Sequence, residues 1–381
     1  MDEEIVDFAL DCALNKKVEY AEVRGHNQVQ NGIMLRNGVV EAVVSVVDSG
    51  FCVRIMANGG IGFASSNKWT KEEAKAVVSM AFKYANSANR KEKLVFADEK
   101  GVDAKWTVDQ KKNIEDVSLE ERMSAIAAID KALASSKVKI AATASSCSTS
   151  LITKYFVNSE GSQISSYVPR LGAYFFITVA EQGKTEQAYE QFGYSGGWEA
   201  FGKWKIPEKM VHDAKILKSV ITEAKALKPG TMDLVCGSEV AGIAAHESCG
   251  HPMEADRILG REMSQAGRSF IYKGGQYWIG TRIGSKAVTV VDDPTVGNSY
   301  GYYKYDDEGV KARRRFLYKE GVINEFLHNR ESAAKMDTKS NGSSRSVSYD
   351  REAIVRMANT FVLPGEFTEE ELIKKSSMVF T

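Results

Sequence analysis

Twice within its first 229 residues, the chain passes from a capped amphipathic helix through β-rich runs and into another helix. The first helix is predicted over residues 2–15, where apolar residues recur with the period of a helix. Four short β-rich runs follow between residues 19 and 65, and Asn37-Gly38 between two of them favours a hairpin, since both residues accept positive φ. A capping box then predicts a helix over residues 70–85.

The same order of elements recurs in the second part of this region. Ser118 and Glu121 form another capping box ahead of a helix that is predicted to end near Ala134. Strand-like runs follow at 138–145, 151–157, 171–180 and 185–192, and then a long amphipathic helix over 207–227. The pattern predicts an α+β fold of antiparallel strands with flanking helices, and it is compatible with a duplicated α-ββββ-α unit.

Pro229-Gly230 marks the predicted boundary between an N-terminal α/β domain, 1–229, and a β-rich C-terminal domain, 230–381. The second domain is expected to be mainly antiparallel β and to carry a helix with two histidines. Its last residues, 377–381, read as the start of a strand, so the domain is expected to be incomplete. The expected elements are a strand at 232–236, a helix at 238–250, strands at 287–291, 310–318, 322–327 and 361–363, and a helix at 368–375.

Charge and composition exclude several classes of protein. Lys plus Arg and Asp plus Glu both number 50, so the net charge of zero argues against direct nucleic-acid binding. The one dense basic run, at 311–315, is read as a solvated strand edge or loop. No apolar stretch approaches the roughly 20 residues of a membrane span, and the acidic N-terminus is unlike a signal peptide. Five cysteines without framework spacing predict a reducing, cytoplasmic location.

Two of the five histidines, His246 and His251, lie in a His-Glu-x-x-x-His segment. In a regular helix, residues five apart point in different directions, about 140° from each other, so they could not share a metal ion. Pro252 is expected to push His251 out of α geometry, and Gly250 accepts an unusual backbone. A helix that breaks or widens into a π-bulge here would bring both imidazoles to one side.

This arrangement suits a zinc peptidase, in which imidazoles hold the ion and a carboxylate such as Glu247 takes a proton from the activated water. Structural histidines near a helix end explain the same segment equally well. Cys249 is read as a buried thiol, and Glu254 and Asp256 as orienting partners of the imidazoles or as solvated carboxylates. His328 lies in a predicted polar loop. The contexts of His26 and His212 are surface-like, and the glycine groups read as β-turns.

The chain resembles the TldD branch of the TldD/PmbA metallopeptidases, also described as modulators of DNA gyrase. The resemblance depends on several separate segments that occur in the expected order in the C-terminal domain. These segments are 246–254, 290–295, 305–309, 328–333, 340–345 and 356–360.

The resemblance implies a zinc peptidase that acts on unfolded or extended polypeptides, including the leader peptides of modified peptides. It implies that His246 and His251 bind zinc, that Glu247 is the general base, and that the subunit forms a homodimer or pairs with a TldE/PmbA-type subunit. An extended substrate would suit a β-rich domain, because an added strand gains main-chain hydrogen bonds with little side-chain preference.

The third zinc ligand of the family is a cysteine in a Cys-Gly-Lys segment near the C-terminus, and this sequence has no cysteine after Cys249. His328 or Glu254 could replace it, since catalytic zinc normally has three protein ligands. The alternative is a non-catalytic binding or regulatory subunit, or a truncated fragment, without stoichiometric zinc. A metallohydrolase with a non-peptide substrate is a third reading, because the motif specifies the activated water and not the substrate.

Overall fold

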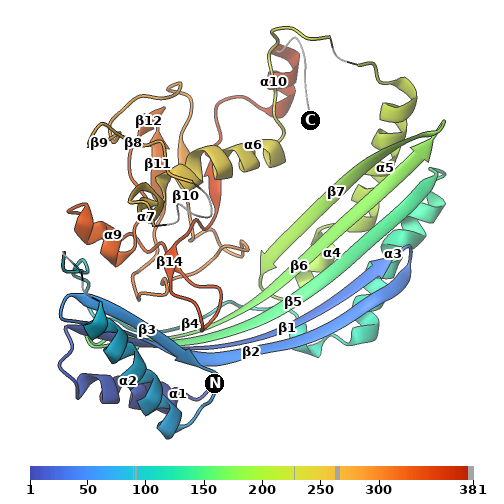
Figure 1. Cartoon of the computed structure of the whole chain (residues 1–381). Coiled ribbons are helices and arrows are strands. Elements are labelled where there is room, and N and C mark those ends of the chain that lie inside the picture. The colour runs from blue at the N-terminus through green and yellow to red at the C-terminus, as the bar shows by residue number, and fades with distance from the viewer. Residues whose placement is uncertain (89, 91, 227, 262–266, 376–381) are drawn as a thin grey trace.

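The structure, a computed structural model, describes residues 1–381 apart from 89, 91, 227, 262–266 and 376–381. Its N-terminal part is a long curved sheet with helices on one face, and the C-terminal part lies over the opposite face (Figure 1). Helices and mainly antiparallel strands confirm the predicted α+β class. The N-terminal elements are α1 (Glu3–Leu14), β1 (Tyr20–Arg36), β2 (Val39–Ala57), β3 (Gly60–Ser66), α2 (Lys71–Ser87), β4 (Asp103–Thr107), η1 (Ile114–Asp116), α3 (Leu119–Ser135), β5 (Ile140–Asn158), β6 (Gln163–Glu181), β7 (Lys184–Ser195), α4 (Glu199–Lys203) and α5 (Ile206–Glu223).

The strands are much longer than the sequence predicted. β1, β2, β5 and β6 have 17 to 19 residues each, and the runs predicted separately at 138–145 and 151–157 both belong to β5. The Ser- and Thr-rich stretch between those runs continues the strand, because polar side chains are tolerated where one face of a sheet is not packed. Each half therefore has three consecutive strands between its helices and not four.

The sheet order is β3-β2-β1-β5-β6, and β4 and β7 both pair with the far side of β6. All pairs are antiparallel except β4 with β6. The hairpin between β1 and β2 confirms its predicted turn, since Asn37 and Gly38 have φ of 51° and 76°. β1 and β5 pair at the centre, so the two helix–three strands–helix units meet side by side there.

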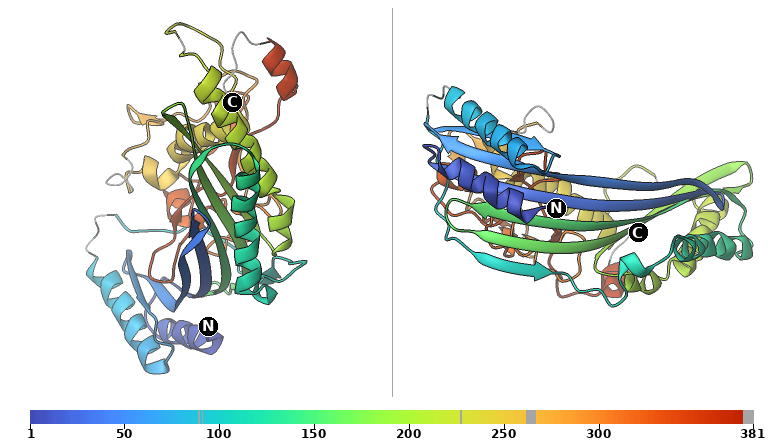
Figure 2. Two further views of the ribbon diagram at one scale, coloured as in Figure 1. Left: turned by 90° about the vertical axis from the view of Figure 1, so that its right-hand side faces the viewer. Right: turned by 90° about the horizontal axis from the view of Figure 1, so that it is seen from below.

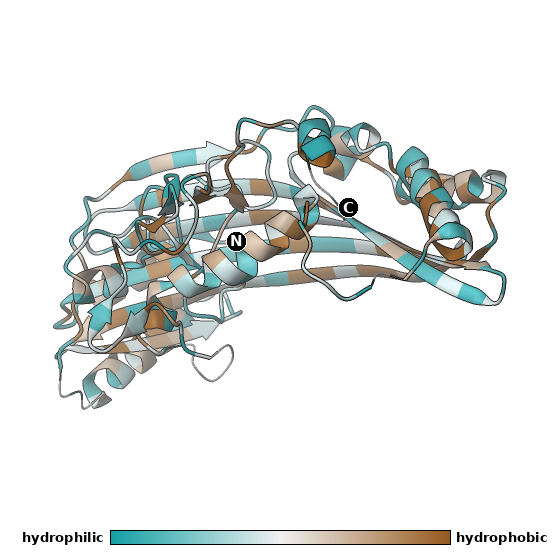
Figure 3. Ribbon diagram, turned by 90° about the horizontal axis from the view of Figure 1, so that it is seen from above, coloured by the Kyte–Doolittle hydropathy of each residue, from teal (hydrophilic) through white to brown (hydrophobic). Residues whose placement is uncertain are grey.

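Two hydrophobic cores lie on the same face of the sheet, at its two ends. α1 and α2 cover one end and α3 and α5 the other (Figure 2). Tyr155 contacts the first core and Cys147 the second, and both are odd-numbered residues of β5. The even-numbered Phe156 points to the opposite face and packs against the C-terminal part. Figure 3 shows hydrophilic and hydrophobic residues alternating along these long strands.

The C-terminal part contains short strands joined by long connections. Its four-stranded sheet, β12-β11-β10-β15, is antiparallel. The strand predicted at 232–236 is wrong, because that segment has no regular structure. The strand start predicted at 377–381 lies outside the described residues. The elements are α6 (Ser238–Ala244), η2 (Ala245–Gly250), η3 (His251–Met253), α7 (Ala255–Ile258), β8 (Tyr272–Lys273), β9 (Gln276–Tyr277), β10 (Val290–Asp292), β11 (Arg315–Lys319), β12 (Val322–Ile323), α9 (Arg330–Lys335), β13 (Ser344–Arg345), β14 (Ile354–Val355), β15 (Thr360–Val362) and α10 (Glu369–Lys375).

Buried ion pairs join the C-terminal part to the sheet. Arg54 Nη2 on β2 donates to Glu308 Oε1 at 2.8 Å, and Lys154 Nζ on β5 donates to Asp307 Oδ1 at 2.8 Å. Removing one partner of such a pair would leave a buried charge uncompensated, so these contacts fix where the C-terminal part sits. The basic run at 311–315 is not wholly solvated as predicted, because Arg315 is fully buried against Asp292.

Candidate metal centre

The two histidines of the predicted motif stand at either end of a π-helical turn. η2 follows α6 directly, and the backbone N–H of His251 donates to the carbonyl oxygen of His246. This hydrogen bond closes over five residues, so His246 and His251 lie about one turn apart, as residues four apart do in an α-helix. The widened helix expected from the sequence is confirmed.

Proline and glycine contribute to this turn in a different way than predicted. His251 keeps right-handed helical angles, φ −55° and ψ −41°, and Pro252 is the second residue of the 3₁₀ turn η3. Gly250 also has right-handed angles. Its importance is steric, because a Cβ atom at Gly250 would lie 1.9 Å from Met357 Sδ.

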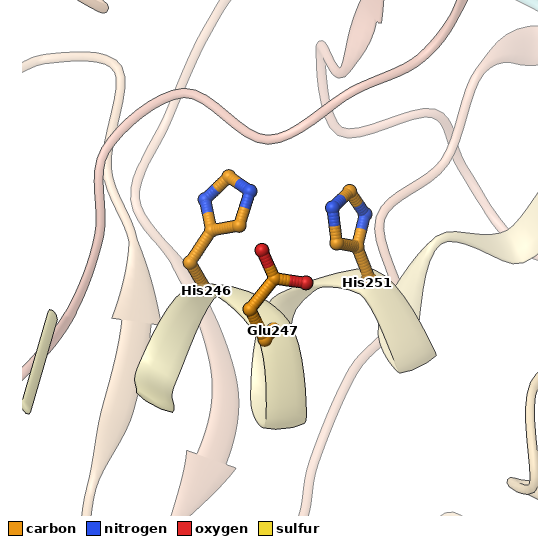
Figure 4. A group of neighbouring side chains, drawn as sticks. All are labelled: His246, Glu247 and His251. Atoms are coloured by element: carbon orange, nitrogen blue, oxygen red, sulfur yellow. The ribbon is translucent and has the colours of Figure 1, made fainter. Parts of the chain in front are cut away.

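The turn places three potential ligands together. The imidazole rings of His246 and His251 are 4.7 Å apart between centroids and nearly perpendicular, at 86°. One ligand atom from each histidine and one from Glu247 all lie within 4.8 Å of one another. Figure 4 shows both imidazoles on the same side of the turn with the Glu247 carboxylate between them. His246 and Glu247 are exposed and His251 is half-buried, so the group is open to solvent.

The buried carboxylate of Glu254 contacts the imidazole of His251. Glu254 is fully buried, and its Oε2 lies 2.9 Å from His251 Nδ1. The same oxygen accepts from Arg257 Nε at 3.0 Å and from Nη2 at 2.9 Å. With Nδ1 engaged in this way, Nε2 of His251 is left for a metal ion. The sequence did not single out Arg257, although its spacing of three residues from Glu254 is that of a helical ion pair.

The core of the C-terminal part keeps the turn in place. Ala245 and Met253, on either side of the histidines, are buried in one cluster with Val290 of β10 and Leu317 of β11. Met357, which contacts Gly250, belongs to the same cluster. The backbone that carries the histidines is thus packed on the four-stranded sheet, whereas the side chains face solvent.

The other candidate residues lie outside this group among the described residues. Cys249 packs against the same core, and burial raises the pKa of its thiol, which opposes the thiolate form that binds metals. His328 is buried beside Ser332, with Nδ1 and Oγ 3.2 Å apart. Asp256 accepts from the backbone N–H groups of Val355 and Arg257, and burial raises its pKa to about 6.

The donor set fits zinc. Two imidazoles with a carboxylate next to one of them are groups that Zn²⁺ binds in proteins, and a histidine whose other nitrogen meets a buried carboxylate is the usual arrangement around it. Catalytic zinc has three protein ligands, so a residue besides the two histidines would complete the set.

Family models match the chain from near its start to near its end. PmbA/TldA metallopeptidase domain 1 matches residues 21–85, the central domain 112–227 and the C-terminal domain 229–380. A metalloprotease of Methanocaldococcus jannaschii is 31% identical over 361 residues, which are 93% of this chain and 76% of that protein. A zinc metalloprotease TldD homologue of Saccharolobus solfataricus is 23% identical, over 93% of this chain and 75% of its own.

Solved structures share the fold. A proposed modulator of DNA gyrase from Thermotoga maritima has a TM-score of 0.79 at 17% identity, covering 98% of this chain and 80% of the other. TldE from Thermococcus kodakarensis has a TM-score of 0.72 at 16% identity, with the same coverage of both chains. None of the described helices is long and apolar enough to cross a membrane.

Proposed function

The chain belongs to the PmbA/TldD metallopeptidase family, and we propose that it is a zinc-dependent peptidase that hydrolyses unfolded or extended polypeptides. The observation that carries the proposal is the π-helical turn, which brings His246, Glu247 and His251 to one side. A helix widened for packing alone would not need two imidazoles and a carboxylate together at its exposed face.

Each residue of the turn has a separate role in the proposal. His246 and His251 hold the ion through ring nitrogens, and Glu254 keeps the ring of His251 in one orientation. When bound, zinc supplies a positive charge that acidifies water and polarises the carbonyl to be cleaved. Glu247 accepts the proton from the attacking water and passes it to the leaving amine, which its exposed position beside both histidines allows.

The exposure of the site supports this substrate class. His246 and Glu247 project from an exposed turn, where an extended chain segment can reach both residues. Extended segments, such as leader peptides, present their peptide groups without prior unfolding. We place this activity in the cytoplasm, since all five cysteines are free thiols.

The proposal includes a dimer, either of two copies or with a TldE/PmbA-type subunit. Residues 39–50 of β2 form a sheet edge, because β3 pairs only with β2 residues 51–57. Four valines on this edge, at 43, 44, 46 and 47, are between 49% and 64% exposed. A bare, valine-rich edge strand readily pairs with another strand, which supports a subunit contact there.

Zinc content and cleavage of an unfolded peptide test the catalytic assignment. We expect about one zinc per chain in the wild type, none in His246→Ala, and full zinc with cleavage lowered about 100- to 10,000-fold in Glu247→Gln. The matched control is Glu239→Gln, an exposed glutamate on α6 outside the group, which should keep both properties.

Each departure from this result points to a different error. Loss of zinc in Glu247→Gln would show that Glu247 is a ligand and not the general base. Full cleavage activity in that variant would show that Glu247 is not the general base. A wild-type chain without stoichiometric zinc would favour the non-catalytic binding subunit.

A further inference from the structure

A cleft of about 1010 Å³ separates the helix-free face of the sheet from the C-terminal part. Its floor follows the strands, because alternate residues of β5 from Ser148 to Phe156 line it, as do alternate residues of β1 from Arg24 to Gln30. At about 3.3 Å per residue, the β5 floor alone is roughly 27 Å long. The cleft therefore has the length of an extended peptide of about eight residues.

Positive charge dominates this cleft although the whole chain is neutral. Seven Lys or Arg residues line it against three Asp or Glu residues. Lys154 pairs with Asp307, Arg261 with Glu352 and Arg351 with Asp350, which neutralises three of the seven. The excess was hidden in the sequence because the cations come from β1, β5, β6 and four separate positions of the C-terminal part.

Two arginines in the cleft have no carboxylate partner among the described residues. Arg170 of β6 packs over Tyr300 at 5.2 Å, and Arg345 of β13 packs over Tyr303 at 5.5 Å, measured to the ring centroids. Burial and the nearby charge of Arg345 lower the pKa of Arg170. Like charges held close together in a half-buried place repel each other, and an anion between them would relieve that repulsion.

Some residues that line the cleft carry buried polar atoms that make no hydrogen bond among the described residues. They include both ring nitrogens of His26, Nε of Arg24, Nε1 of Trp106 and Oγ of Ser150, on residues that are 8% exposed or less. His26, predicted to be at the surface, is in fact buried, and burial lowers its pKa to about 4, so it is neutral at pH 7.

We propose that this cleft binds an extended peptide segment rich in Asp and Glu and so selects acidic substrates for the peptidase. The inference rests on the proposed function for its biological meaning. Arg170 and Arg345 would bind the carboxylates, and the serine and glutamine side chains of the floor would bind the peptide groups. The volume is too small for a nucleic-acid duplex, and its strand-like length favours a peptide over a compact anion.

Fluorescence anisotropy of labelled ten-residue peptides tests this selection without any cleavage. The protein is the full chain carrying Glu247→Gln in chelator, and the probes are an Asp/Glu-rich, a neutral and a Lys-rich peptide. We expect the acidic peptide to bind at least tenfold more tightly than the other two peptides. Its affinity should fall as the salt concentration is raised. Arg170→Ala and Arg345→Ala should each lower the affinity for the acidic peptide about tenfold, and Arg170→Lys should lower it by a smaller factor.

The control is Arg36→Ala, an exposed arginine paired with Glu41 outside the cleft, which should bind the acidic peptide normally. Equal binding of the three peptides, unchanged affinity in Arg170→Ala, or tighter binding of a single-stranded oligonucleotide would overturn the proposal. Circular dichroism of each variant identifies any that fails to fold. Since binding is measured without metal or cleavage, an inactive enzyme that still selects acidic peptides would refute the peptidase and leave this proposal standing.

Discussion

Glu254 has the contacts of a residue that orients a metal ligand. It is fully buried, touches His251 Nδ1 at 2.9 Å and is itself held by two hydrogen bonds from Arg257. We expect Glu254→Gln to weaken zinc binding about 10- to 100-fold, because the amide accepts less strongly from the ring than the carboxylate does. Competition with a fluorescent chelator measures the change.

Glu352→Gln is the matched control, since Glu352 also pairs with an arginine, Arg261, but lies away from the histidines among the described contacts. Its zinc affinity should equal that of the wild type. Complete loss of zinc in Glu254→Gln would instead make Glu254 a ligand, and an unchanged affinity would contradict any role.

His328 is predicted to make the stability of the protein depend on pH. Burial lowers its pKa to about 4, whereas the unfolded chain has the ordinary value of about 6.5. Between these values the unfolded state binds more protons, so the stabilising effect of a neutral His328 is present above pH 6.5 and is lost as the pH falls towards 4. The loss amounts to at most about 3 kcal/mol.

Urea unfolding of chelator-treated protein between pH 6.5 and 4.5 measures this slope. His328→Gln should flatten the fall in stability, and His212→Gln, at an exposed residue of α5, should leave it unchanged. An identical slope in wild type and His328→Gln would contradict the prediction. Zinc content of the same variant is expected to be normal, because His328 lies outside the group of ligand atoms.

Among the elements, the π-helical turn depends on one close contact with its neighbour. Gly250 packs against Met357, which follows β14, and there is no space for a Cβ atom. We expect Gly250→Ala to destabilise the fold by about 1–3 kcal/mol and to weaken zinc binding, because the methyl group must displace the turn or the methionine. Urea unfolding and zinc titration measure both effects.

A double-mutant cycle with Met357→Ala separates this contact from a general effect of alanine in a helix. Met357→Ala alone leaves a cavity and should cost about 2–5 kcal/mol, and the double variant should be more stable than the sum of the two losses predicts. Strictly additive losses would mean that the contact does not determine the turn. Gly242→Ala, in α6 with open space around it, is the control.

The π-helical turn could be predicted from the sequence, because the spacing of five residues between the histidines is a local feature. The way in which Gly250 and Pro252 contribute to it could not. The lengths of the strands could not be predicted from the sequence. The polar stretch in the middle of β5 reads as a break between two runs, yet it continues as strand because its neighbours on both sides, β1 and β6, satisfy its backbone.

For the whole molecule, most of the segments that carry the family resemblance build the fold and not the site. Asp307 and Glu308 bind Lys154 and Arg54 of the sheet, and Arg330 binds Glu160 through two hydrogen bonds of 2.7 Å. A sequence gives no sign of these pairs, because their partners lie more than 150 residues away. The same distance hides the positive cleft, so its charge emerges only when the C-terminal part folds over the sheet.

The unpaired edge of strand β2 predicts that the protein forms a dimer. Residues 39–50 offer unpaired backbone groups on one side and exposed valines on both faces, and no other described strand pairs with that side. If a second copy pairs there, Val44→Lys with Val46→Lys should convert a dimer to a monomer, because charged side chains on an edge strand disfavour strand addition. Sedimentation velocity measures the mass of each variant.

Ile216→Lys with Val220→Lys is the matched control, since these α5 residues are 48% and 41% exposed and also apolar. This pair should leave the dimer intact if the edge itself is the contact. A dimer that survives the lysines in β2, or that dissociates with the lysines in α5, would place the subunit contact elsewhere. Unfolding midpoints of both double variants at low protein concentration should match, because all four positions are exposed in the single chain and their substitution removes no buried contact.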